Sequence, residues 1–389
     1  MDQRTRAYVA SGAIVAFFVL VQLGALALVA PFEAAGYQAV DDPQDPTNSV
    51  AYVGAILVVT GLMLAAIKYD VTWLIRLGMV FAGAYISLFV LRVVVPPVVT
   101  LPVAGAAVNV LAWLGAGALG VALFVYPEWY VIDAAGVLMG AGGAAIFGIS
   151  FGVLPAILLL VVLAVYDAIS VYGTEHMLTL ASGVMDLKVP IVLVVPLSLS
   201  YSYLDGGAPN HIDEGGTDDE GVSAGEADGD ADTRAADGDA ETTPVDSGAE
   251  TADGATPGDD DPEAADGTPS GDDDSETAAD SPGDVLDREA LFIGLGDAVI
   301  PTVLVASAAF FAPDSVPTVG LLGLEASLPA VTAMVGTSAG LVVLLWMVLK
   351  GRAHAGLPLL NGGTIAGYLL GALASGLTLV QALGIESYV

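Results

Sequence analysis

Two aspartates stand inside apolar stretches that are long enough to cross a membrane. Asp167 interrupts the run from Leu154 to Val171, and Asp297 ends the string Gly-Leu-Gly-Asp within Ala290 to Ala312. A lone Asp at the centre of a membrane helix costs about 2.5–3.5 kcal/mol on insertion scales, so two such residues indicate a shared role. Because no Lys or Arg lies at that depth to pair with them, the aspartates predict acid–base chemistry.

The two aspartates are expected at equal depth on neighbouring antiparallel spans. Glu175 marks one end of the sixth span and Glu289 the matching end of the seventh, and each Asp is eight residues from its marker. At 1.5 Å per residue, both carboxyls lie about 12 Å below the same membrane face. Two carboxyls in one site share a proton, so one activates water while the other protonates the leaving nitrogen. The pair therefore predicts peptide-bond hydrolysis without an acyl-enzyme.

Glycines flank Asp297. Gly294 lies three residues earlier on the same helical face, and Gly296 is its neighbour in the chain. Both lack a side chain, so a substrate backbone or the sixth span can approach closely and the helix can unwind locally. In a chain with 47 glycines a GxGD string alone is weak evidence, and its place inside an apolar span gives it weight.

The composition describes two different kinds of chain. The sequence is 55% hydrophobic with a mean hydropathy of +0.74, yet its formal charge is −34. Most of the acid is concentrated, because 29 of the 44 acidic residues lie between Asp205 and Glu289. The rest of the chain has the composition of a membrane protein. Such dense acid is typical of a cell with high internal salt, where charges are screened.

About 20 apolar residues are needed to cross a bilayer, and the chain contains nine such stretches. We therefore predict an all-α membrane protein with nine transmembrane helices, the first of which is retained and not removed as a signal peptide. The expected spans are Tyr8 to Ala30, Val50 to Ile67, Val71 to Val95, Val103 to Val125, Val131 to Ile149, Leu154 to Val171, Ala290 to Ala312, Leu328 to Leu349 and Leu357 to Leu379.

Charge sets the expected orientation and domain organisation. Nine of the ten cations fall on the side of the N-terminus and only Arg92 does not, which predicts a cytoplasmic N-terminus and an extracytoplasmic C-terminus. We expect helices 1–6 in residues 1–175, a short apolar juxtamembrane segment in 176–204, a disordered acidic cytoplasmic loop in 205–287, and helices 7–9 in 288–389. Within the juxtamembrane segment, Lys188 to Pro196 is rich in β-branched residues and too short to span a bilayer. Two interpretations stay open: a strand with an edge for strand addition, and an apolar segment that lies against the helix bundle.

Three short motifs resemble the signatures of a known family. Tyr166-Asp167, Gly294 to Asp297, and Ala355 to Pro358 are similar to the YD, GxGD and PAL motifs of the presenilin and signal peptide peptidase family, with archaeal members most similar. These are intramembrane aspartyl proteases. The nine spans and the large hydrophilic loop between the sixth and seventh extend the resemblance over nearly the whole chain. In the third motif Ala355 and Gly356 replace the usual Pro and Ala, which makes it the least secure of the three.

The resemblance implies an endopeptidase that cuts transmembrane segments of membrane proteins or signal peptides in the lipid bilayer, without a metal or cofactor. It implies Asp167 and Asp297 as the catalytic pair. The residues that it implies for the substrate cleft are Tyr166, Gly294, Leu295, Gly296, Gly356, Leu357 and Pro358. The resemblance does not fix the oligomeric state, and a homo-oligomer is one possible state. Nucleic acid is not an expected partner, because a net charge of −34 repels phosphate.

Other hydrolytic chemistries fit the sequence less well. A zinc protease needs HExxH on a helix, and the three histidines, His176, His211 and His354, do not have that spacing. Gly336 to Gly340 matches GxSxG, but no histidine in a neighbouring span is placed to deprotonate Ser338, so packing of small residues explains the string better.

Two alternatives use membrane acids. A proton-coupled transporter or channel also needs paired carboxyls, but the sequence shows neither an inverted repeat nor two broken helices in corresponding halves. A prepilin-type peptidase shares the GxGD acid but has fewer spans and lacks the Tyr-Asp motif. Four further acids, Glu128, Asp133, Glu175 and Asp186, are expected at span ends, within reach of the headgroups.

Overall fold

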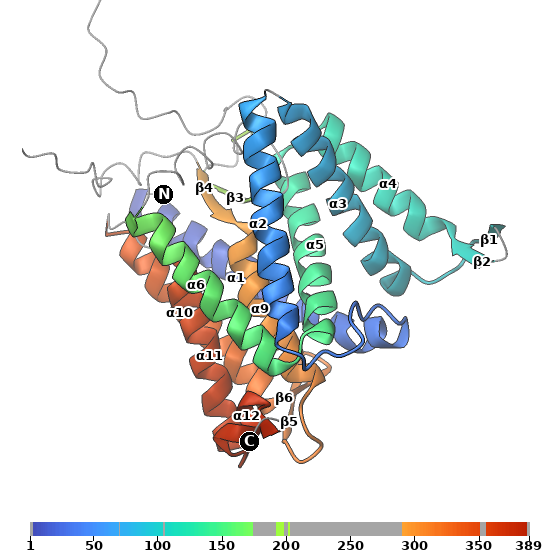
Figure 1. Cartoon of the computed structure of the whole chain (residues 1–389). Helices are drawn as coiled ribbons and strands as arrows, with labels where there is room; N and C mark the ends of the chain where they lie inside the picture. Colours follow the sequence, from blue (N-terminus) through green and yellow to red (C-terminus); the bar gives the residue numbers. More distant parts are fainter. Residues whose placement is uncertain are drawn as a thin grey trace, which may run out of the picture. The chain divides into compact units, whose positions relative to one another are not determined.

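The computed structural model describes residues 3–69, 71–103, 106–173, 192–197, 201–202, 290–350 and 355–386. The predicted acidic loop and most of the juxtamembrane segment lie outside these ranges. Within them, seven helices are long and apolar enough to cross a membrane, and two further apolar helices are shorter (Figure 1). These helices follow the order of the predicted spans, so the all-α multi-pass fold is confirmed.

Each apolar helix overlaps one predicted span, because a helix satisfies its own backbone hydrogen bonds in lipid. In chain order they are α1 (Gln3–Ala34), α2 (Thr47–Lys68), α3 (Thr72–Val94), α4 (Val110–Val125), α5 (Trp129–Ser150), α6 (Val153–Gly173), α9 (Leu295–Phe310), α10 (Leu328–Val348) and α11 (Gly356–Ala374). The ninth span was predicted too long: α11 ends at Ala374, Gly376 turns the chain with φ +84°, and the short α12 (Leu379–Leu383) follows.

The fourth predicted span begins too early. Residues 100–109 form an antiparallel hairpin of β1 (Thr100–Val103) and β2 (Ala106–Asn109), and α4 starts only afterwards. Asn109 ends the strand and caps the helix, because its Oδ1 accepts the backbone N–H three residues later at 3.4 Å. A second hairpin, β5 (Thr318–Leu321) with β6 (Leu324–Ser327), connects α9 to α10.

The seventh predicted span is a helix only in part. Its first five residues form β4 (Ala290–Gly294), which runs antiparallel to β3 (Val192–Pro196), and α9 begins at Leu295. Of the two interpretations of Lys188 to Pro196, the described part forms the strand, and its middle also packs inside the protein; residues 188–191 lie outside the described ranges. Strand backbone is tolerated at membrane depth only where protein covers it, and the middle of β3 is buried.

Helix α9 is the centre of the bundle. It contacts α1, α5, α6, α10 and α11 (Figure 1). Every residue from Pro301 to Ala308 is buried. At 1.5 Å per residue its 16 residues span about 24 Å, less than the hydrocarbon core of about 30 Å, and β4 supplies the remaining length. Because Asp297 lies in the first turn of α9, directly after β4, it stands within the length that the strand and the helix cover together.

Glycines bring α10 and α11 into backbone contact. A Cβ on Gly363 would collide with the carbonyl oxygen of Gly336, and one on Gly340 would lie 3.1 Å from the carbonyl carbon of Leu359. Such close approach is a means by which membrane helices gain van der Waals packing. The Ser338 hydroxyl donates to the Met334 carbonyl of its own helix. The packing interpretation of the GxSxG string is thus confirmed.

Candidate active site

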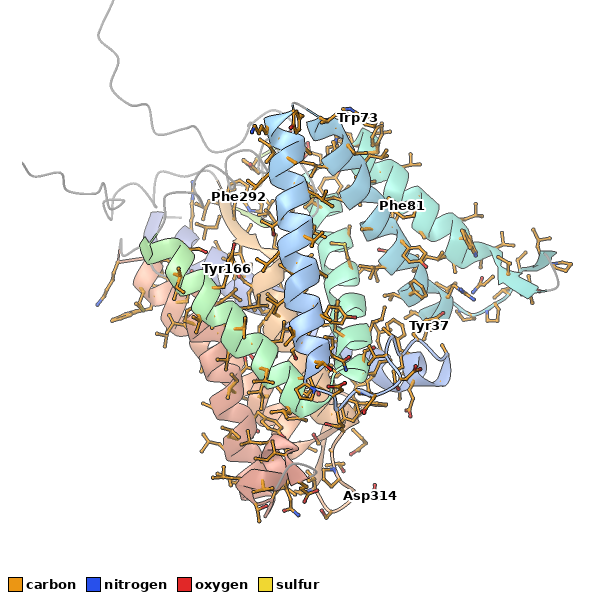
Figure 2. All side chains as sticks on the ribbon, in the orientation of Figure 1. Tyr37, Trp73, Phe81, Tyr166, Phe292 and Asp314 are labelled. Carbon is orange, nitrogen blue, oxygen red and sulfur yellow. The ribbon has the colours of Figure 1, made fainter. Side chains whose placement is uncertain are left out.

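Asp167 lies near the end of α6, in the last two turns of the helix. Its side chain is 8% exposed, whereas that of the adjacent Tyr166 is 50% exposed (Figure 2). Two turns earlier, the Asn361 amide of α11 donates to the Leu160 carbonyl of α6 at 2.9 Å. This bond ties the two helices together, so the position of Asp167 relative to α11 is fixed by a buried side chain.

The N-terminus of α11 contacts Asp167 through its backbone. The Leu357 N–H donates to Asp167 Oδ2 at 3.0 Å. Leu357 is the second residue of α11, and the first N–H groups of a helix have no acceptor within it. The positive end of the helix dipole also favours a carboxylate at this place. The third motif therefore acts at Asp167 through a main-chain group.

Asp297 lies in the first turn of α9, directly after β4, and is partly buried. Its Oδ2 is 3.4 Å from the point where a Cβ on Gly294 would stand, and 3.9 Å from the same point on Gly356. A side chain at either glycine would thus face the carboxyl. The absence of a side chain at Gly294, the nearer position, leaves the space on that side of Asp297 open to a substrate backbone, whereas a methyl group at Gly356 would make only an ordinary contact.

The first turn of α11 brings the two aspartates together. Asp167 accepts from Leu357, and Asp297 faces Gly356, the preceding residue of the same turn. The two helices that carry the aspartates, α6 and α9, are also in direct contact. The meeting of the sixth and seventh spans that the sequence predicted is therefore present in the structure.

The remaining predicted cleft residues divide into two groups. Gly296 is exposed, with nothing within 4 Å of its Cβ position, and Pro358 is partly buried in the first turn of α11. Leu295 is 6% exposed, and its Cδ1 lies 3.1 Å from the Cβ position of Gly140 on α5. Leu295 thus packs α9 against α5.

Two polar residues near the site were missed from the sequence. Asn361 was not singled out, although a carboxamide inside an apolar span was visible. Asp133 was expected only as an acid within reach of the headgroups, but its side chain is 3% exposed inside the protein, and its Oδ1 accepts the Val194 N–H of β3 at 2.7 Å. The position of Asp133 four residues inside α5 indicated that this acid is buried, but only the tertiary structure reveals that it binds β3.

The structure gives no support for a metal centre in the part of the chain that it describes. Among those residues, no three His, Cys, Asp or Glu side chains are grouped as a metal site would require. The three histidines of the sequence, His176, His211 and His354, lie outside the described ranges.

Comparison with known proteins decides the family. The family model described as "Signal-peptide peptidase, presenilin aspartyl protease" matches residues 15–222 and 267–377. The chain belongs to this family. A solved presenilin family intramembrane aspartate protease in space group C222 shares 28% identity, with a TM-score of 0.53 over 94% of this chain and 99% of the other. A structure in space group P2 with the same description shares 28% identity, with a TM-score of 0.51 over 93% and 97%. Comparison with curated protein sequences gives no match.

Membership of the family establishes the class of enzyme. The chain is an intramembrane aspartic protease and a multi-pass membrane protein whose substrates are membrane proteins. The resemblance drawn from the three motifs is thereby confirmed.

Proposed function

We propose that Asp167 and Asp297 form the catalytic dyad of this protease and hydrolyse a peptide bond within a transmembrane segment or a signal peptide. The observation that carries the proposal is the convergence of both carboxyls on one turn of α11, at Leu357 and Gly356. A water molecule held between the two carboxyls attacks the scissile carbonyl carbon directly.

The hydrogen bond from Leu357 supports a division of labour between the two oxygens of Asp167. Oδ2 already accepts that N–H, so Oδ1 is the oxygen left to take a proton from the attacking water. Asp297 then supplies the proton that the leaving nitrogen requires. When the products separate, one proton is again shared by the pair, and the dyad is ready for another cycle.

The sheet beside the dyad supports a strand-like path for the substrate. The Val194 N–H points to Asp133, away from β4, so the outer edge of β3 is occupied at that residue. The edge expected on β3 is therefore better placed on β4, where residues 291–294 are partly exposed. A substrate that unwinds and pairs along β4 is led towards Asp297, three residues beyond the end of the strand.

The charge pattern supports the remaining topology. We propose a cytoplasmic N-terminus, an extracytoplasmic C-terminus, and residues 205–287 as a solvated cytoplasmic linker between two catalytic parts, 1–175 and 288–389. In the described residues, Arg6, Lys68, Arg76 and Lys350 follow the cytoplasmic pattern, while Arg92 departs from it. The dense acid of the linker makes nucleic acid an unfavourable partner.

The dyad is tested by replacing each carboxyl with its isosteric amide. We expect Asp167→Asn and Asp297→Asn each to abolish cleavage of a reconstituted single-span peptide in liposomes, because neither half of the acid–base cycle can proceed alone. Asp314→Asn, in the loop after α9, is the matched control and should cleave at the wild-type rate. The thermal midpoint of each variant shows whether the bundle remains folded.

Two results would contradict the proposal. One is wild-type-like turnover in either folded dyad variant. The other is proton or ion flux through the same liposomes in the absence of any peptide product, which is the outcome that the transporter alternative predicts. Measuring peptide products and ion flux on one preparation separates the two functions.

A further inference from the structure

A groove of about 700 Å³ lies between α1, α3 and α5, separate from the catalytic helices. None of its lining residues belongs to α6, α9 or α11, which carry Asp167, Asp297 and Leu357. Leu20 and Val94, from two of its walls, are 52% and 60% exposed, so the groove is open along its side. In a bilayer that open side faces lipid.

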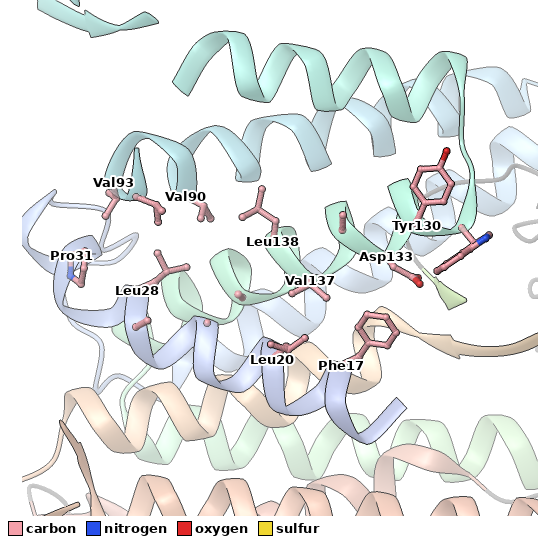
Figure 3. A pocket seen from close by; sticks show the side chains of 16 residues that line it. Phe17, Leu20, Leu28, Pro31, Val90, Val93, Tyr130, Asp133, Val137 and Leu138 are labelled. Carbon is pink, nitrogen blue, oxygen red and sulfur yellow. The ribbon is translucent and has the colours of Figure 1, made fainter. Parts of the chain in front are cut away.

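The length of the groove matches a lipid chain. Its lining on α1 runs from Phe17 to Pro31, which is about 21 Å at 1.5 Å per residue and covers most of the hydrocarbon core of about 30 Å. Figure 3 shows Leu28, Pro31 and Val93 at one end, and Asp133 with Tyr130 at the opposite end. Apart from this second end, the walls are aliphatic.

The carboxyl at the second end has one oxygen without a partner. Asp133 is 97% buried, and its Oδ1 accepts the Val194 N–H, but Oδ2 has no hydrogen-bond partner among the described residues. A buried polar atom left unpaired is destabilising, so the site favours a ligand that brings a partner. A hydroxyl suits this place because it donates to an ionised carboxylate and accepts from a protonated one.

We propose that the α1–α3–α5 groove binds a single-chain amphiphile whose hydroxyl headgroup pairs with Asp133 Oδ2 and whose apolar chain runs towards Pro31. Trp129 and Tyr130 lie one turn before Asp133, where aromatic side chains typically mark the membrane interface. A headgroup at Asp133 is therefore at the depth where lipid polar groups begin. Since the same carboxyl holds β3, the bound lipid also fixes the strand that supports β4.

The test is a titration of the delipidated full-length chain in detergent. The probes are oleyl alcohol and 9-octadecene, which share an apolar chain and differ by the hydroxyl. Unfolding is followed through the four tryptophans, since the chain has no cysteine for a thiol dye. We expect oleyl alcohol to raise the thermal midpoint saturably, and 9-octadecene to need about tenfold more or higher, the equivalent of one hydrogen bond.

Two exposed leucines provide a matched pair of variants. Leu20→Trp fills the groove and should weaken the response to oleyl alcohol by about tenfold or more, because the indole takes up the volume of the chain. Leu57→Trp, on the lipid-facing side of α2 and 53% exposed, leaves the groove unchanged and should respond like the wild type. Both positions are half-exposed, so neither substitution crowds the core.

Three outcomes would overturn the proposal. A midpoint that does not respond saturably to oleyl alcohol means that the alcohol has no discrete site on the protein. Equal potency of 9-octadecene means that the groove binds any apolar chain and that Asp133 forms no hydrogen bond with the hydroxyl headgroup. An unchanged response in Leu20→Trp means that the alcohol binds elsewhere. None of these measurements depends on proteolytic activity, so failure here leaves the dyad proposal intact.

Discussion

The backbone bond from α11 to Asp167 can be removed without changing either aspartate. Leu357→Pro deletes the N–H that donates to Asp167 Oδ2 at 3.0 Å. Proline is tolerated in the first turn of a helix, because an N–H there has no intrahelical acceptor. Leu357→Ala is the matched control, since it shortens the same side chain but keeps the N–H.

The expected loss follows from the geometry. A hydrogen bond to a charged group is worth about 1.5–3 kcal/mol, and Asp167, at 8% exposure, is poorly placed to recover it from water. If that stabilisation is lost in the transition state, kcat/KM falls roughly 10- to 150-fold. The alanine control should retain most of the wild-type kcat/KM.

The assay is cleavage of a single-span peptide in liposomes, with kcat/KM measured for wild type, Leu357→Pro and Leu357→Ala. Thermal unfolding of each variant shows that the bundle is intact. A folded proline variant within twofold of the wild type would refute the reasoning. An equal loss in the alanine variant would show that the side chain, not the backbone, is what the site requires.

Two further substitutions test glycines of α11, one near Asp297 and one in the contact with α10. Gly356→Ala restores the usual residue of the third motif. It should keep near-wild-type cleavage, because the new Cβ would lie 3.9 Å from Asp297 Oδ2, which is an ordinary contact. Loss of cleavage with the fold intact would contradict this expectation. Gly363→Ala should lower the thermal midpoint, because its Cβ would collide with the backbone of α10 and overpacking typically costs 1–3 kcal/mol. Gly362→Ala, with nothing within 4 Å of its Cβ position, should raise or leave the midpoint unchanged, and equal effects at the two glycines would refute the packing explanation.

Much of the architecture was predictable because lipid restricts the choices of the backbone. Apolar runs of sufficient length must be helices in a bilayer, so the positions of α1 to α6, α10 and α11 follow from hydrophobicity. The errors occur where apolar residues do not meet lipid. Ala290–Gly294 is as apolar as a span, but it pairs with Val192–Pro196 as a strand because protein surrounds it.

The candidate site, too, was predictable from the sequence only in part. Asp167 and Asp297 were predictable because an isolated carboxylate in an apolar run is costly and therefore conspicuous. Leu357 was predicted only as part of a motif, and the sequence does not reveal that its backbone N–H is what reaches Asp167. Asp133 was placed near the headgroups because it lies at a span end, and its bond to Val194 was not predictable because that partner is 61 residues away in the chain.

The sequence by itself determined that the chain crosses the membrane repeatedly, and it marked the two carboxyls that apolar surroundings make expensive. Both facts follow from the free energy of transferring individual side chains into lipid, which local composition specifies. Only the tertiary structure decided which helix end, strand and buried side chain surround those carboxyls. Such partners depend on close packing between distant segments, through glycine contacts and single hydrogen bonds, and no local pattern encodes which segments meet.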